Sequence, residues 1–386
     1  MKLRTVSQGM VMKTTLALIS AVCASLLVVS CENWPYKPTQ FIAPVPPPPP
    51  NAFVSRDSLS AFVGTRNVKL AYTKSIPGGN QLLYFVDFSD SIVAPELVKK
   101  PSGKQDWNAN CPILSPDGKL VAYYLTDPSN IKHAAAYCQK LDTNAEPNLI
   151  DDPGSDPHFY KDNQSNNLFI TYTDTTDKID ADTSLKTRHT YKVQINTTTG
   201  QIIPGTKTTI ASFPFFGGMS YDGKYICTGY SNAYIFNTIS QNIFSVNPGK
   251  QTCNPSITPD TQHTGRMMFL NIGGIQAMNT MPSPMQGISL KEHKFVFIAD
   301  TNNNYVNSFS IVDMVPGMAS ASGCEWQCPK WSNIPDFFCA LTSPTGFDPW
   351  DCFIVSISGN KLLKLNKSSL LSFNGLSKPY VYIGGN

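Results

Sequence analysis

The chain has 386 residues and a formal net charge of +3, and only 15% of its residues are charged, against about 25% in an average soluble domain. The excess positive charge lies in residues 1–30, which contain Lys2, Arg4 and Lys13 and no acidic residue. The remainder is therefore neutral. Because nucleic-acid binding needs a basic surface, we expect no nucleic-acid partner.

Residues 1–30 have the pattern of an export signal. A basic segment up to Lys13 precedes an apolar run from Thr14 to Val29. The chain could start at Met1, Met10 or Met12. The run is shorter than the ~20 apolar residues that a membrane-spanning helix needs. We therefore expect residues 1–30 to be a cleaved signal peptide. A retained transmembrane helix is the alternative.

The segment Val28-Val29-Ser30-Cys31 resembles the lipobox of bacterial lipoproteins. It departs from the family pattern at Val28, where Leu is preferred. The resemblance implies that Cys31 carries two or three acyl chains, which together give stable membrane attachment. Glu32 stands where Asp would favour retention in the inner membrane. We therefore expect a lipid-anchored protein of the cell envelope, at the outer membrane.

Residues 31–54 form a proline-rich segment that contains five consecutive prolines, Pro46 to Pro50. Such a run adopts an extended polyproline helix that rises ~3.1 Å per residue. We interpret the segment as a stiff spacer between the anchor and the domain. A ligand for a proline-recognising module is the alternative.

Residues 55–386 show the rhythm of an all-β domain, in which short apolar runs alternate with clusters of Gly, Asn, Asp and Pro. No long pattern of helical period interrupts them. The predicted strands are Val68–Tyr72, Gln81–Phe88, Leu120–Leu125, Leu168–Thr173, His189–Ile195, Tyr225–Tyr230, Phe295–Ala299, Cys352–Ser358, Lys361–Leu365 and Pro379–Ile383.

A strand–turn–strand unit recurs in this domain. Its clearest copy surrounds Ser115-Pro116-Asp117-Gly118, where Pro and Gly suit a tight turn. Copies of Ser115 recur at intervals that bracket the ~40–50 residues of a four-stranded propeller blade. These positions are Tyr160, Ser220, Thr258, Ser289 and Ser332.

The phrases ILSPDGKLVAYY, at residues 113–124, and PKWSNIPDFFCALT, at residues 329–342, resemble the repeats of TolB-like β-propellers. The resemblance covers about residues 60–365. It implies an all-β fold of six or seven four-stranded blades and a periplasmic setting. It implies no activity, because this scaffold supports many functions. Ordinary hairpins of a β-sandwich are the alternative.

Eight cysteines lie beyond Cys31, and an even number in an exported chain favours disulfide bonds. Cys339 and Cys352 lie in runs that look like neighbouring antiparallel strands, so we expect a bond between them. The alternative is a zinc site that these two form with Cys324 and Cys328.

The sequence contains no catalytic or cofactor motif, and we expect neither a cofactor nor a metal. Gly218-Met219-Ser220-Tyr221-Asp222 approaches a nucleophile elbow, but Asp stands where the last Gly belongs. Aromatic residues crowd into the last quarter of the chain. Trp331 aligns with core positions of other repeats, whereas Trp326 and Trp350 are candidates for a ligand-stacking surface.

These observations predict a non-catalytic binding or scaffold lipoprotein that holds an envelope protein or a glycan on a propeller. A glycan-active enzyme, either a glycosidase or a lyase, is the alternative, and paired acids lining the propeller axis would favour it. A structural component of the cell surface is a third possibility.

Overall fold

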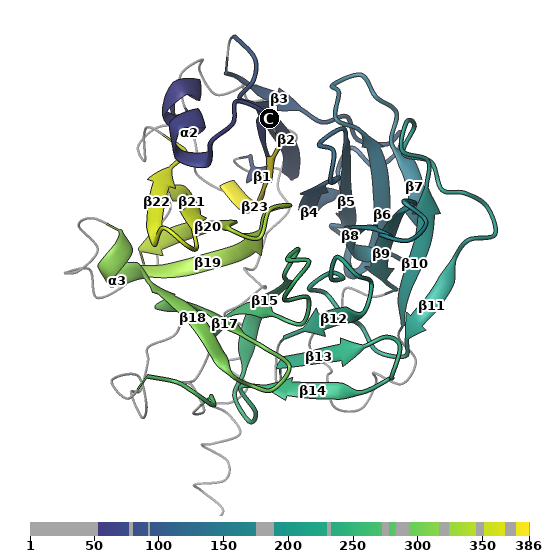
Figure 1. The fold of residues 1–386 in the computed structure, drawn as a ribbon. Coiled ribbons are helices and arrows are strands. Elements are labelled where there is room, and N and C mark those ends of the chain that lie inside the picture. The colour runs from purple at the N-terminus through teal and green to yellow at the C-terminus, as the bar shows by residue number, and fades with distance from the viewer. Residues whose placement is uncertain are drawn as a thin grey trace, which may run out of the picture. The chain divides into compact units, whose positions relative to one another are not determined.

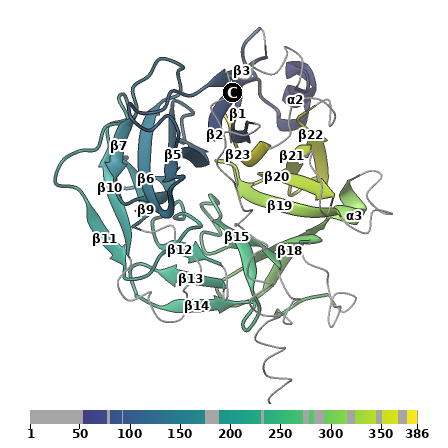
Figure 2. The same ribbon diagram turned by 180° about the vertical axis from the view of Figure 1, so that it is seen from behind.

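Strands in the computed structural model fold into six antiparallel sheets arranged around a common axis (Figures 1 and 2). The sheets belong to one unit, residues 40–386. The structure describes residues 53–76, 80–91, 93–174, 189–229, 233–271, 278–282, 293–315, 324–344, 351–366 and 376–385.

Each sheet is one blade, and the blades are numbered in chain order. From the axis outward, blade 1 contains β23 (Leu376–Ile383), β1 (Val68–Ser75), β2 (Gln81–Asp87) and β3 (Pro95–Leu97). In the same direction, blade 2 contains β4 (Asn108–Leu114), β5 (Leu120–Asp127), β6 (Asn130–Lys140) and β7 (Asn148–Asp151). Blade 3 contains β8 (Ser155–Lys161), β9 (Leu168–Thr173), β10 (Thr190–Ile195) and β11 (Thr208–Ala211).

The second half of the ring continues this order. Blade 4 contains β12 (Tyr225–Thr228), β13 (Ala233–Asn237) and β14 (Ile243–Val246). Blade 5 contains β15 (Thr252–Ile257), β16 (Met267–Asn271), β17 (Phe295–Ala299) and β18 (Tyr305–Ser310). Blade 6 contains β19 (Cys324–Trp331), β20 (Phe337–Pro344), β21 (Asp351–Ser356) and β22 (Lys361–Lys364).

This arrangement is a six-bladed β-propeller, as the repeats predict. The prediction left six or seven blades open, and the number is six because Thr258 and the position of Ser289 fall within one blade. Ser289 itself lies outside the described residues, between β16 and β17 in the chain. Blade 4 departs from four strands: in place of a fourth, innermost strand, Met219 makes an isolated bridge to Ile226.

The last strand of the chain closes the ring. β23 pairs with β1, so that Val68 lies opposite Ile383 and Leu70 opposite Val381. Blade 1 is therefore built from both ends of the domain, and its innermost strand comes from the C-terminal end. At the other end, Phe53 bridges to Asn366 beside blade 6 and is buried.

All the predicted strand runs are confirmed, although their ends shift by a few residues. Several strands were not predicted, among them β13, β14, β16 and β18. β6 was also missed, because Ala134, Ala135 and Ala136 have low strand propensity. The sequence reading also missed α2 (Arg56–Val63), whose Ser55 side chain accepts a hydrogen bond from Ser58 N–H at the N-terminus. A second short helix is α3 (Ile311–Met314). No helix in the described ranges has the length and apolar character required to cross a bilayer.

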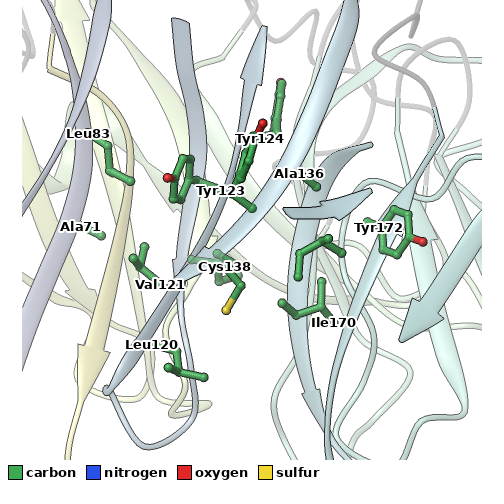
Figure 3. Packing of buried hydrophobic residues seen from close by; sticks show 14 of the residues in the cluster. Ala71, Leu83, Leu120, Val121, Tyr123, Tyr124, Ala136, Cys138, Ile170 and Tyr172 are labelled. Carbon is green, nitrogen blue, oxygen red and sulfur yellow. The ribbon is translucent and has the colours of Figure 1, made fainter. Parts of the chain in front are cut away.

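The core consists of side chains packed between neighbouring blades. In blade 2 the apolar residues of β5 and β6 face blades 1 and 3, and Figure 3 shows Val121 and Cys138 between Ala71 and Ile170. Tyr123 of β5 stacks on Tyr137 of β6, and their ring centroids lie 6.0 Å apart. β5 is buried along six consecutive residues because apolar blades cover both of its faces.

The repeated turn has the same hydrogen bonds in its two best copies. Ser115 Oγ donates to Asp117 Oδ1 at 2.6 Å and accepts from the N–H of Leu120 at 2.9 Å. Ser220 Oγ likewise donates to Asp222 Oδ1 at 2.6 Å and accepts from a backbone N–H at 2.9 Å. Both serines are fully buried. Ser220 is therefore a structural residue of the turn.

The glycine of each turn lies against a tyrosine from the preceding blade. Gly118 has φ +68° and Gly223 has φ +69°, a region that side chains rarely adopt. A Cβ atom at Gly118 would lie 2.5 Å from the ring of Tyr382, and one at Gly223 would lie 2.3 Å from Tyr160 Oη. The missing side chain thus allows neighbouring blades to approach.

We predict that Gly118→Ala lowers the free energy of unfolding more than Gly205→Ala. Gly205 has φ +77° with no atom within 4 Å of an added Cβ, so it reports only the backbone cost, about 1–2 kcal/mol. Overpacking against Tyr382 adds a further ~1–3 kcal/mol at Gly118. Denaturant unfolding measures both variants, and equal losses would contradict the packing role.

Candidate functional site

The two faces of the propeller differ in the length of their connections. Because neighbouring strands are antiparallel, Thr173 at the end of β9 lies opposite Ser155 at the start of β8 and Thr190 at the start of β10. The connections from second to third strands therefore share a face with the starts of the innermost strands. We call this the loop face and the opposite one the turn face.

The two longest connections within blades begin and end on the loop face. They are residues 174–189 in blade 3 and 272–294 in blade 5. On the turn face, the longest connection within a blade is residues 196–207, between β10 and β11. Variable loops on a rigid scaffold commonly carry binding residues, which makes the loop face the candidate binding surface.

Five innermost strands share a bulge at a residue that precedes a proline. Each of these residues has positive φ, and the strand pairing shifts across it because proline has no N–H for the ladder. We call these five residues the axial ring. They are Cys111 (φ 43°), Asp156 (φ 47°), Asn254 (φ 50°), Cys328 (φ 48°) and Lys378 (φ 50°).

The sequence reading missed the axial ring, although the chain carries a signal for it. Pro112 precedes Ser115 by three residues, and Pro329 precedes Ser332 by the same distance. Searching for proline at that distance before each repeat would have found four of the five ring residues, but not Lys378, which no predicted repeat follows. Blade 4 lacks this proline, in keeping with the missing innermost strand.

Directly after two of these prolines, His158 and Lys330 meet across the axis. Lys330 Nζ lies 3.3 Å from His158 Nε2, although the residues belong to blades 6 and 3, which lie opposite each other in the ring. His158 Nε2 also lies 2.9 Å from the carbonyl oxygen of Phe216. Since a carbonyl only accepts, Nε2 carries the hydrogen, and the ammonium of Lys330 is a charged neighbour of the ring rather than a donor to it.

A glycine makes room for this histidine. A Cβ atom at Gly218 would lie 2.7 Å from His158 Nδ1. Blade 4 therefore contributes a glycine without a side chain, Gly218, beside the buried ring of His158.

Lys378 is held between blades 1 and 2. Its Nζ donates to Asn110 Oδ1 at 2.9 Å and lies 5.9 Å from the ring centroid of Tyr124. The sulfur of Cys111 lies 4.0 Å from Tyr124 Oη. Two innermost strands thus place an ammonium group, an amide and a thiol together near the axis.

The predicted stacking role of Trp326 is wrong. Its side chain has no exposed surface, its Nε1 donates to the carbonyl oxygen of Phe309 at 3.1 Å, and Phe353 packs against it edge-on. Trp326 therefore belongs to the core. Trp331 is buried, as expected. Trp350 lies outside the described residues.

The predicted disulfide between Cys339 and Cys352 is also wrong, and none of the eight described cysteines is disulfide-bonded. The two strands are neighbours, but Cys339 lies opposite Ile354 and Cys352 opposite Leu341, so the sulfurs are offset diagonally. Burial raises the pKa of Cys339 to about 12 and that of Cys352 well above its usual value. Both thiols therefore stay protonated and unreactive.

The alternative of a zinc site gains no support. No three His, Cys, Asp or Glu residues cluster suitably for a metal ion anywhere in the described ranges. The signal peptide, Cys31 and nearly all of the proline-rich segment lie outside those ranges, so the anchor and the spacer stay predictions.

Comparison with solved structures supports the propeller architecture. No family model matches the sequence, and no curated protein does. Among solved structures, TolB from Acinetobacter baumannii matches with a TM-score of 0.53 and 14% identity, over 84% of this chain and 69% of TolB. The fold is TolB-like. A prolyl endopeptidase matches with a TM-score of 0.44 and 14% identity, over 93% of this chain and 56% of its own.

At these identities the likeness shows the TolB-like fold alone, and the function has to be argued from the chain's own residues.

Proposed function

We propose that this protein is a lipid-anchored binding protein of the bacterial cell envelope, in which Cys31 holds the membrane and the loop face of the propeller holds a protein partner. The observation that carries the binding half is that the two longest connections within blades lie on one face, at the end of the axis where the innermost strands begin. The lipobox resemblance and the spacer support the anchoring half.

The distribution of acids favours binding over the glycosidase or lyase alternative. Along the described innermost strands, the acidic residues are Asp156 and Glu325. Glu325 faces His293, with its Oε2 3.3 Å from Nδ1, at the junction of blades 5 and 6. Glycosidases need two carboxylates that flank one bond. Glu325 is instead paired with His293, and Asp156 is the one other acid on these described strands.

We predict that Cys31→Ala abolishes incorporation of labelled palmitate and releases the protein from membranes. The thioether that would carry the acyl chains cannot form without the cysteine sulfur, and the remaining domain has no second lipid group in this proposal. Cys23→Ala, in the apolar run of the signal, is the matched control and should remain labelled and membrane-bound. Continued labelling of the Cys31→Ala protein would rule out the anchor.

We also predict that the partner binds the loop face. Replacing residues 175–188 with a Gly-Ser linker should reduce cross-linking to the envelope partner at least tenfold. Ile239→Asp, at a side chain 77% exposed on the turn face, should leave it unchanged. Partners are identified by cross-linking in cells and mass spectrometry. If only the Ile239→Asp variant lost the partner, the interface would lie on the turn face, and the prediction would be contradicted.

A further inference from the structure

We propose that the outer edge of blade 4 pairs with the same edge of a second copy of this chain. The interaction surface is the outward edge of β14 (Ile243–Val246), and its occupant is β14 of the second copy, antiparallel to the first. The result is a symmetric dimer in which one sheet runs through two propellers. This interface is independent of the lipid anchor and of the loop face.

β14 lies at the outer rim of the ring, and one of its edges faces away from the axis (Figures 1 and 2). Its other edge pairs with β13 without a shift in register. Where the two strands join, Asn237 N–H donates to the carbonyl oxygen of Asn242 at 2.8 Å, in continuation of that register. Because hydrogen-bonded pairs alternate along an antiparallel ladder, Phe244 and Val246 also bond to β13.

The backbone groups of Ile243 and Ser245 therefore point away from β13. Neither residue has a backbone hydrogen bond to a described residue on that outward side. Their side chains are exposed as well, and the exposed fraction of Ile243 is 51%. N–H and C=O groups repeated at every second residue are the pattern to which an added strand binds.

The other five outer strands carry features that oppose pairing at a sheet edge, and β14 carries none of them. β3 has only three residues, and Pro95 and Glu96 are two of them. Shifts in register interrupt the pairing of β7, β11 and β18 with their neighbours. β22 begins and ends with lysine, and Phe53 bridges to the chain just beyond it. β14 has no such shift and contains neither proline nor a charged residue.

The distribution of charge selects a second copy as the occupant. From Tyr225 to Gly249 the sequence contains no Asp, Glu, Lys or Arg, so all three strands of blade 4 are uncharged. Two such edges approach each other without like-charge repulsion and without the cost of desolvating an ion. An acidic or basic partner would find no counter-charge on this blade.

Apolar side chains flank this edge on both faces of the sheet. Ile243 lies opposite Phe236, whose ring packs in the core between blades 3 and 4. Phe244 lies on the other face, beside the core between blades 4 and 5, and its ring centroid is 6.4 Å from that of Tyr225. A second strand along the edge would cover part of both side chains, which adds apolar burial to the backbone hydrogen bonds.

Size-exclusion chromatography with light scattering, on the full-length lipoprotein in detergent, tests the proposal through the mass of the particle. We expect two chains per particle at high protein concentration and dissociation on dilution. Hydrogen exchange locates the interface. The amide hydrogens of Ile243 and Ser245 should exchange more slowly in the dimer than in the diluted monomer, because in the dimer they lie within a ladder.

Ser245→Pro removes an outward N–H from each copy and leaves the ladder with β13 intact. The dissociation constant should rise about tenfold or more, because the symmetry of the dimer removes two hydrogen bonds. Ile243→Lys should prevent dimerisation, because like charges then meet at the two edges. Thr209→Lys, at an exposed position on β11, is the matched control and should leave the dimer unchanged. Thermal unfolding shows whether each variant is folded.

A monomer at every protein concentration would overturn the proposal, and so would a dimer that persists in both β14 variants. A monomer that loses an envelope partner in cells through Ile243→Lys would also overturn it, because the edge would then pair with another protein. If Ser245→Pro fails to fold, Ile243→Lys and the exchange of the Ser245 amide still decide. Membrane release by Cys31→Ala and cross-linking through the loop face do not depend on β14, so these outcomes leave the proposed function standing.

Discussion

Pairing of β23 with β1 is the constraint on which the rest of the structure depends. No covalent bond among the described residues closes the six-bladed ring, and the backbone ladder that joins Val68 to Ile383 and Leu70 to Val381 does so instead. The same strand places Tyr382 over Gly118 of blade 2 and brings Lys378 to Asn110. Ring closure, packing between blades and the chemistry of the axis therefore depend on one strand.

The axis follows from a backbone feature. A proline in five innermost strands removes a ladder hydrogen bond, and the residue before it takes positive φ. The fold repeats this bulge, while the side chain at the bulge differs between blades and ranges from Lys378 to Asp156 and Cys111. The scaffold thus fixes where these groups lie and leaves their chemistry open.

The local strand–turn–strand repeats were predictable from the sequence. Contacts that depend on how distant strands pair and pack were not. Ser115-Pro116-Asp117-Gly118 determines its own turn, so blade positions could be read locally. The burial of Trp326 and the diagonal offset of Cys339 from Cys352 depend on strand register and on neighbouring blades. A two-residue alternation cannot tell which face of a strand is covered when both faces meet other blades.

Native-state hydrogen exchange of the full-length protein tests ring closure most directly. If β23 closes the ring, backbone amides of Val381 and of Leu70 in β1 should exchange only through global unfolding, at the same free energy as the central strand β5. Exchange of the β23 amides through a local opening, several kcal/mol below that of β5, would show that the ring stays folded without its last strand and would contradict this account.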